Sequence, residues 1–218
     1  MTIFIFLILY IVLTILAIYS KLKNRNLYIY TKALPIFLLL FMVAISVIYT
    51  KNNAFQLWLL IGLIFGVMGD ILLLRKDWFV FGGISFLIGH LFYTIAFFCL
   101  PISIPFVPII IIIVICISYA LFLIKNLDKD KRKRYLPIVI SYISIISIMF
   151  LSSLSFNLQY KKVEGSWLVL GAGLFMLSDG ALSYGKFVKS SVPQEFLVSL
   201  TYYTAQFLII FAGLQIKI

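Results

Sequence analysis

Four ionisable side chains lie inside long apolar segments of this sequence: Lys32, Asp70, His90 and Asp179. Burying a charge in hydrocarbon is costly, so such residues usually face a protein interior or a wet cavity. Carboxyl and imidazole groups in such a place can donate and accept protons during a reaction. We therefore take Asp70 and Asp179 as candidate catalytic residues, with Lys32 and His90 as candidate supporting residues.

Further polar side chains share helical faces with these four. Tyr93 lies one turn beyond His90, and Gln206 lies one turn beyond both Tyr202 and Tyr203. Their hydroxyl and amide groups could orient a polar ligand. A series of glycines lies on the helical face that carries Asp70, which favours close helix packing with the carboxylate turned inward; these are Gly62, Gly66 and Gly69.

Each candidate also has a purely structural interpretation. An aspartate could pair with Lys32 only for packing, and His90 could be an ordinary interhelical donor. The two neighbouring tyrosines could be core residues, and Gln206 could simply join two helices. Acids at matching places in two parts of the chain favour a functional role, because a neutral packing contact needs no acid.

The elements that carry these residues are predicted to be membrane-spanning helices. Hydrophobic residues make up 64% of the 218 and charged residues 11%, a balance that excludes an ordinary soluble domain. A spanning helix needs about 20 mainly apolar residues. The sequence predicts an all-α bundle of about eight such helices, near 2–20, 30–50, 55–74, 79–100, 105–124, 135–156, 166–184 and 196–215. We expect the first to be a span and not a removable signal peptide.

The basic residues predict the orientation of these spans. The odd-numbered connections carry thirteen Lys and Arg residues, whereas the even-numbered ones and the C-terminus carry four. Because cytoplasmic loops accumulate such residues, we expect a multi-pass plasma-membrane protein with both termini outside. The same rule accounts for the net charge of +11 without a nucleic-acid partner. The basic cluster 129–134 is interpreted as a topology determinant, with a lipid-headgroup site as the alternative.

Two internal similarities suggest a duplicated four-helix unit within one integral membrane domain, 1–218. Lys32-Ala-Leu-Pro-Ile opens the second predicted span, and Arg134-Tyr-Leu-Pro-Ile opens the sixth. Gly62 precedes Asp70 by eight residues, as Gly171 precedes Asp179. The predicted halves, about 1–104 and 105–218, would run in the same direction through the membrane.

Several short motifs give the sequence a resemblance to the YhhN-like lysoplasmalogenase family, eight-span proteins that include animal lysoplasmalogenases. The resemblance covers nearly the whole chain, and the order and spacing of its motifs are fairly specific. They are Lys32-Ala-Leu-Pro, Gly69-Asp70 with Leu72 and Leu73, Phe81 through Phe86 to Gly89-His90 and Tyr93, Ser178-Asp179, and Thr201-Tyr202-Tyr203 with Ala205-Gln206.

This resemblance implies hydrolysis of the vinyl ether bond of lysoplasmalogens. The products would be a fatty aldehyde and a glycerophospho-ethanolamine or -choline, so the implied partners are a lysophospholipid substrate and the bilayer. The site implied by the family comprises Lys32, Asp70, His90, Tyr93, Asp179, Tyr203 and Gln206. No oligomeric state is indicated.

Cleavage of an enol ether needs a proton at the outer vinyl carbon and water to trap the resulting oxocarbenium ion. One of two carboxyl groups held close together at low dielectric can stay protonated at neutral pH. We therefore expect Asp70 and Asp179 to share the roles of acid and stabilising anion. His90 would relay a proton or bond the ether oxygen, and Lys32 would hold the phosphate near the cytoplasmic interface, where a polar funnel that ends near mid-membrane opens. We expect no metal or other cofactor, since Cys99, Cys116 and a lone His do not form a ligand set.

The main alternative is a small membrane transporter or lipid-binding protein, in which the acidic pair would couple protons or cations. Broken helices would favour transport. The sequence instead predicts that both Leu-Pro pairs lie in first turns of spans, where proline is tolerated without a break. A structural or assembly protein, the third possibility, would need no buried acids.

Overall fold

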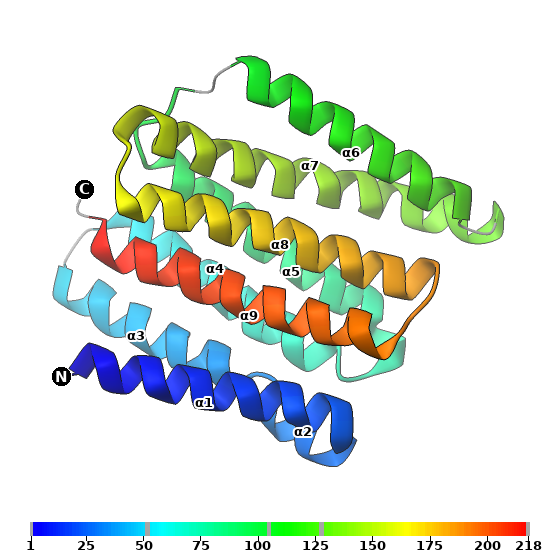
Figure 1. The fold of residues 1–218 in the computed structure, drawn as a ribbon, viewed down its shortest axis with the longest axis horizontal. Coiled ribbons are helices and arrows are strands. Elements are labelled where there is room, and N and C mark those ends of the chain that lie inside the picture. The colour runs from blue at the N-terminus through cyan, green and yellow to red at the C-terminus, as the bar shows by residue number, and fades with distance from the viewer. Residues whose placement is uncertain (1, 51–52, 104–105, 127–128, 217–218) are drawn as a thin grey trace.

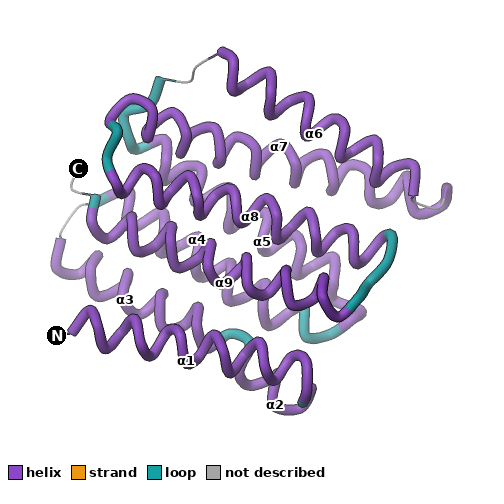
Figure 2. Tube along the Cα trace, viewed as in Figure 1, coloured by secondary structure: helices purple, strands orange, loops and turns teal. Residues whose placement is uncertain are grey.

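The computed structural model describes residues 2–50, 53–103, 106–126 and 129–216, with the side chains of 2–3 and 129–134 left aside. Its elements in chain order are α1 (Thr2–Lys23), α2 (Arg25–Thr31), α3 (Leu34–Thr50), α4 (Ala54–Leu72), the short 3₁₀ helix η1 (Lys76–Trp78), α5 (Phe79–Phe98), α6 (Phe106–Asn126), α7 (Lys129–Tyr160), α8 (Val163–Phe187) and α9 (Val192–Gln215). Short loops join the helices (Figure 2), and no strand occurs in these described ranges.

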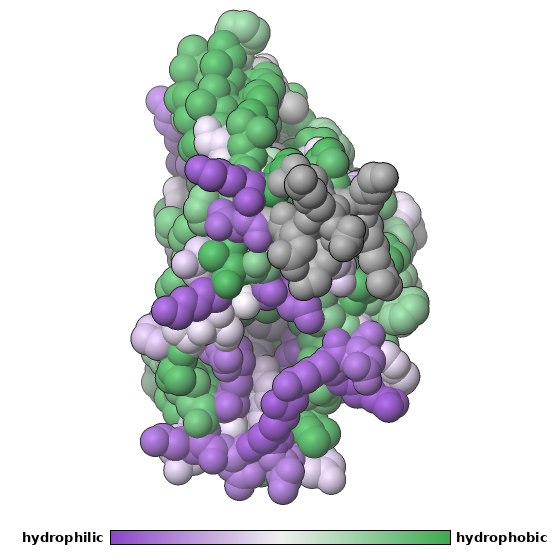
Figure 3. All heavy atoms as spheres, turned by 90° about the vertical axis from the view of Figure 1, so that its right-hand side faces the viewer, coloured by the Kyte–Doolittle hydropathy of each residue, from purple (hydrophilic) through white to green (hydrophobic). Residues whose placement is uncertain are grey.

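Eight segments of the described chain are long and apolar enough to cross a membrane, which confirms the predicted all-α bundle. Their ends lie within a few residues of the predicted ones. Figure 1 shows the N- and C-terminal labels at one end of the bundle. The α1–α2, α4–α5 and α8–α9 connections lie at the opposite end, where Figure 3 shows hydrophilic side chains gathered over part of the surface. The cluster 129–134 lies outside the described side chains.

The prediction of an unbroken second span was wrong. Residues 25–50 form two helices, α2 and α3, separated by a turn at Lys32 and Ala33. Pro35 has no N–H to bond the Thr31 carbonyl, so the helix cannot continue through this point without losing a hydrogen bond. Pro137, in contrast, lies inside the continuous helix α7. The turn leaves the Lys32 carbonyl to another partner, described below.

Glycines let two helix pairs approach closely. A Cβ atom at Gly62 would lie 2.5 Å from the Tyr93 ring and 3.1 Å from the Gly89 carbonyl oxygen, so α4 packs directly on α5. A Cβ at Gly171 would lie 2.7 Å from Ile209 and 3.1 Å from the Ala205 carbonyl oxygen, so α8 packs on α9 in the same way. Small residues are what membrane helices use to bring backbones together.

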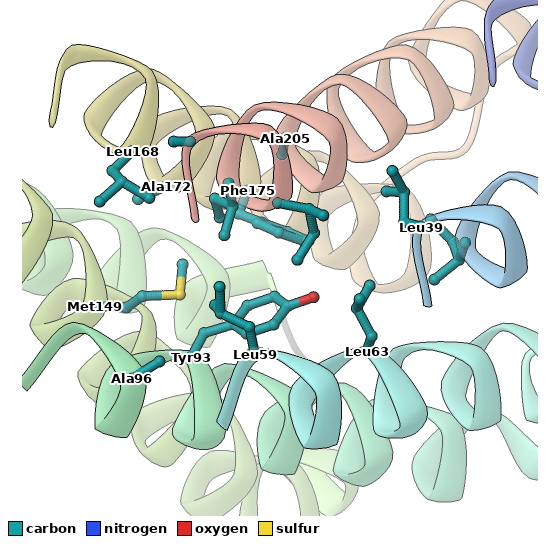
Figure 4. Close-up of a cluster of buried hydrophobic side chains, with 14 of the residues drawn as sticks. Leu39, Leu59, Leu63, Tyr93, Ala96, Met149, Leu168, Ala172, Phe175 and Ala205 are labelled. Atoms are coloured by element: carbon teal, nitrogen blue, oxygen red, sulfur yellow. The ribbon is translucent and has the colours of Figure 1, made fainter. Parts of the chain in front are cut away.

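The packed core lies between α4, α5, α8 and α9. Figure 4 shows its apolar side chains, with Leu59 and Leu63 of α4 facing Phe175 of α8 and Ala205 of α9. Helix α9 is the most enclosed of the eight spans: 61% of its most apolar stretch is buried inside the protein. The corresponding share for α6 is 11%. Figure 1 accordingly shows α6 at one edge of the bundle, beside α7. Most site residues are therefore held by the enclosed helices, and α6 packs against α7 on the outer side of the bundle.

Candidate active site

Asp70, near the end of α4, is buried, and each of its carboxyl oxygens has a polar neighbour. The Tyr202 hydroxyl donates to Oδ2 at 2.8 Å, and Lys32 Nζ lies 3.5 Å from Oδ1. Lys32 also donates to the Asp70 backbone carbonyl at 2.9 Å. The Tyr203 hydroxyl donates to the Lys32 carbonyl at 2.8 Å, which occupies the acceptor exposed by the break between α2 and α3. We call these four residues the Asp70 cluster.

Tyr93 and Gln206 lie beside this cluster. The Tyr93 hydroxyl of α5 donates to Gln206 Oε1 of α9 at 2.7 Å, and both side chains are buried. A Cβ atom at Gly66 would lie 3.3 Å from Gln206 Nε2 and 4.0 Å from the Tyr202 hydroxyl, so this glycine makes room for both. Six of the eight predicted site residues therefore gather where α4, α5 and α9 meet the α2–α3 turn.

Asp179, on α8, has a different pair of partners, His90 and Tyr142. His90 Nε2 lies 3.5 Å from Asp179 Oδ2, yet neither atom makes a hydrogen bond in the described part of the chain. Tyr142 of α7 lies at the other side of the imidazole, with its hydroxyl 3.5 Å from His90 Nδ1, and it also interacts with the Asp179 carboxyl group. We call His90, Tyr142 and Asp179 the Asp179 cluster.

Aromatic rings connect the two clusters. The Phe175 ring lies edge-on to His90, with centroids 4.8 Å apart, and edge-on to Tyr202, with centroids 5.8 Å apart. No hydrogen bond links the carboxyl groups of Asp70 and Asp179 in the described chain; each has its own set of partners. The two acids therefore have different surroundings, and each is paired with a residue from the other predicted half of the chain.

A cavity of about 540 Å³ opens beside Asp179, between α5, α6, α7 and α8. Asp179 is the acidic side chain in its lining, and the lining otherwise is mostly apolar, with residues such as Phe86, Ile115, Leu123, Ile138, Ile143 and Met176. Two polar groups from facing helices also line it: the Tyr119 hydroxyl donates to the Gly180 carbonyl at 2.6 Å and lies 2.7 Å from the Ser183 hydroxyl. The cavity can hold a hydrocarbon chain with one acidic group at its wall.

No three His, Cys, Asp or Glu side chains of the described residues come together in a way that could hold a metal ion. Cys99 and Cys116 are both free, and the Cys116 thiol lies 2.9 Å from the Ser147 hydroxyl. The described site therefore offers carboxyl, imidazole and phenol groups for its chemistry.

Sequence reasoning missed Tyr142 and Tyr119. The chain has 13 tyrosines, and Tyr142 is one of three in α7, so composition does not distinguish either residue. The available signal was spacing: Tyr142 follows Tyr135 by seven residues, which places both on one face of α7. Both line the cavity.

Comparison with known proteins gives consistent matches. The chain is 30% identical to lysoplasmalogenase TMEM86A of Bos taurus over 191 residues, which cover 84% of this chain and 77% of that protein. It is 32% identical to lysoplasmalogenase TMEM86B of Mus musculus over 161 residues, 72% of this chain and 64% of that protein. The human TMEM86A protein, also a lysoplasmalogenase, is 27% identical over 191 residues, again 84% of this chain and 77% of the relative.

No solved structure matches the chain. The model of the YhhN family matches residues 27–213, a range that holds both clusters, the third to seventh spans and all but the outermost residues of the second and eighth. Together with its relatives, this match shows that the chain belongs to the YhhN family.

Proposed function

We propose that this protein is a membrane-embedded lysoplasmalogenase that hydrolyses the vinyl ether bond of 1-alkenyl-glycerophospholipids, with Asp179 as the proton donor. The observation that carries the proposal is the placement of Asp179: its side chain is 14% exposed and stands in the wall of an apolar cavity, with Oδ2 3.5 Å from His90 Nε2. The relatives named lysoplasmalogenase supply the substrate class.

The reaction begins with transfer of the Asp179 proton to the outer carbon of the vinyl group. The double-bond electrons form the new C–H bond, and the ether oxygen shares the positive charge of the oxocarbenium ion. Water then adds to the carbon next to the oxygen and loses a proton, which gives a hemiacetal. The hemiacetal breaks into a fatty aldehyde and the glycerol hydroxyl, so one water molecule is consumed and the proton returns to the enzyme.

The same carboxyl group serves twice in this scheme. As the anion, Asp179 stabilises the adjacent oxocarbenium ion, much as a carboxylate does in glycoside hydrolysis. His90, 3.5 Å away, is the acceptor for the proton that the attacking water loses. Tyr142, at 3.5 Å from the other ring nitrogen, orients the imidazole and completes a path for the proton.

Asp70 has a supporting role in this proposal. Its carboxylate is engaged by Lys32 and Tyr202, and it is absent from the cavity lining. Through Tyr202 it fixes the ring that packs on Phe175, which in turn packs on His90. Lys32 serves as the counter-ion of Asp70, a role different from the phosphate binding expected from the sequence.

The orientation of the site follows from the charge distribution. The cavity extends towards the end of the bundle that holds the odd-numbered connections, as the lining residues Phe79, Tyr135 and Phe187 indicate. Because these connections are rich in Lys and Arg, we place this end in the cytoplasm and both termini outside. The plasma membrane is the proposed location.

The broken second span is the observation that would favour a transporter. In transporters, the free backbone groups at such a break bind the substrate or ion. Here the Lys32 carbonyl is bonded to Tyr203, and the Lys32 ammonium group is bonded to Asp70. These contacts occupy the Lys32 carbonyl and ammonium groups with partners inside the protein, which supports the enzyme.

The test is aldehyde release by the purified protein in a non-ionic detergent. A 1-alkenyl lysophosphoethanolamine and its choline analogue are the substrates, and the saturated 1-alkyl ether, which has no double bond to protonate, is the matched negative control. Wild type should release aldehyde from the vinyl ethers alone, and Asp179→Asn from neither. Folded wild-type protein that releases no aldehyde from either headgroup would overturn the proposal.

A further inference from the structure

The cavity beside Asp179 has an inner and an outer end. Its lining runs along α7 from Ile146 to Tyr135 and along α8 from Met176 to Phe187, each a length of roughly 16 Å. Asp179 lies near the inner end. The outer end lies at the surface that holds the α4–α5 and α8–α9 connections (Figure 1).

Lys186 stands at this outer end. Its ammonium nitrogen lies 4.2 Å from the centroid of the Phe79 ring, and Phe79 lines the cavity. The neighbouring Phe187 also lines it, with its ring edge-on to Phe79 at 6.5 Å. A cation over the face of an aromatic ring is held there by the quadrupole of the ring. The side chain is exposed, so a positive charge is fixed at the rim of an apolar cavity.

Asp179 and Lys186 share one face of α8. They are seven residues apart, which is about two helical turns and roughly 10 Å along the axis. In a lysoplasmalogen, the glycerol unit separates the vinyl ether from the phosphate. An extended glycerophosphate together with the flexible lysine side chain bridges this distance when the vinyl group lies at Asp179.

We propose that Lys186 binds the phosphate diester of a lysophospholipid whose reacting bond lies at Asp179. The inference rests on the proposed function for the position of the vinyl ether. The hydrocarbon chain would continue past α6, the least buried span, into the bilayer. Lys32, the residue expected to hold the phosphate, is buried and bonded to Asp70.

Lys186 also suits a purely topological role, because a cation stabilises the last turn of a helix and cytoplasmic ends are basic. That role predicts no effect on ligand binding, and it applies equally to Lys189, an exposed lysine three residues later. Lys189 therefore provides the matched control.

The experiment measures equilibrium binding of 1-alkyl lysophosphocholine, a saturated ether that is not hydrolysed, to the purified protein in a non-ionic detergent. Lys186→Gln should weaken this binding about tenfold, as expected for loss of one charge-assisted contact. Lys186→Arg and Lys189→Gln should bind like wild type. A 1-alkylglycerol, which has the same chain and no phosphate, should bind all four proteins equally.

Three results would overturn the proposal. Equal losses in Lys186→Gln and Lys189→Gln would mean a general surface potential, and an equal loss for 1-alkylglycerol would mean altered cavity packing. Inorganic phosphate is added as a competitor to separate a lipid site from a simple anion site, and displacement by phosphate at the affinity of the lipid would also contradict it. Because the probe is not a substrate, these results stand whether or not the protein releases aldehyde.

Discussion

Asp70 and Asp179, the two acids at the candidate site, have contrasting environments. Asp70 lies in a tightly packed region where α4, α5 and α9 meet, with an ammonium group and a phenol as partners. Asp179 faces a cavity under the loosely covered α6–α7 side, and one of its oxygens has no hydrogen-bond partner in the described chain. A carboxylate with satisfied partners contributes to structure, whereas one that faces an open space is available to a substrate.

Asp179→Asn should have the largest effect on catalysis and thereby separate the roles of the two acids most clearly. Loss of the proton donor should lower kcat about 10²- to 10⁴-fold, because general acid catalysis typically contributes this much. The unfolding midpoint should remain close to wild type, since Asp179 has few partners to lose. Aldehyde release and unfolding in mixed detergent micelles measure the two quantities. If this variant has the kcat of wild type, Asp179 is not the proton donor.

Asp70→Asn should act mainly on stability. Removing one member of a buried ion pair leaves Lys32 without its counter-charge and should cost about 3–5 kcal/mol of unfolding free energy. The double variant Lys32→Met with Asp70→Asn should recover part of that loss, because no buried charge is left alone. The same unfolding assay tests both proteins. A stable Asp70→Asn protein without activity would instead assign Asp70 to the chemistry.

The packing difference between the two regions can be tested with one substitution at two glycines. Gly62→Ala should destabilise the protein by about 1–3 kcal/mol, since the new methyl group would meet the Tyr93 ring and the α5 backbone. Gly83→Ala, at a cavity-lining residue with nothing within 4 Å of the added Cβ, should change stability by less than about 0.5 kcal/mol. Equal effects at both sites would argue against an open cavity beside α5.

Two tyrosines, one from each cluster, distinguish a role in the chemistry from a role in stability. Tyr142→Phe removes the hydroxyl beside His90 and should lower kcat roughly tenfold, about 1.4 kcal/mol in the activation free energy, with stability little changed. Tyr202→Phe removes the donor to Asp70 and should cost about 1.5–3 kcal/mol of stability with a smaller change in kcat. Kinetics and unfolding are measured for both. A reversed pattern would exchange the roles assigned to the two clusters.

Much of the fold could be predicted from the sequence, because an apolar run of sufficient length has few alternatives in a bilayer. All eight spans were located within a few residues, and Lys51, Lys161 and Lys162 fell between them as expected. The break before Pro35 was missed, since proline near a helix start is usually tolerated and the turn depends on partners from α4 and α9.

The sequence by itself determined which residues were unusual: acids, a histidine and a lysine in apolar surroundings, in an order that indicated the family. It could not determine how they are paired, because the spacing that places a side chain on one face of a helix does not say which helix that face meets. Only the tertiary structure placed Lys32 and Tyr202 next to Asp70. It also placed His90 and Tyr142 next to Asp179, and it put the cavity beside Asp179 and not beside Asp70. Those pairings arise from contacts between residues up to 132 apart in the chain, such as Tyr202 and Asp70, which no local pattern encodes.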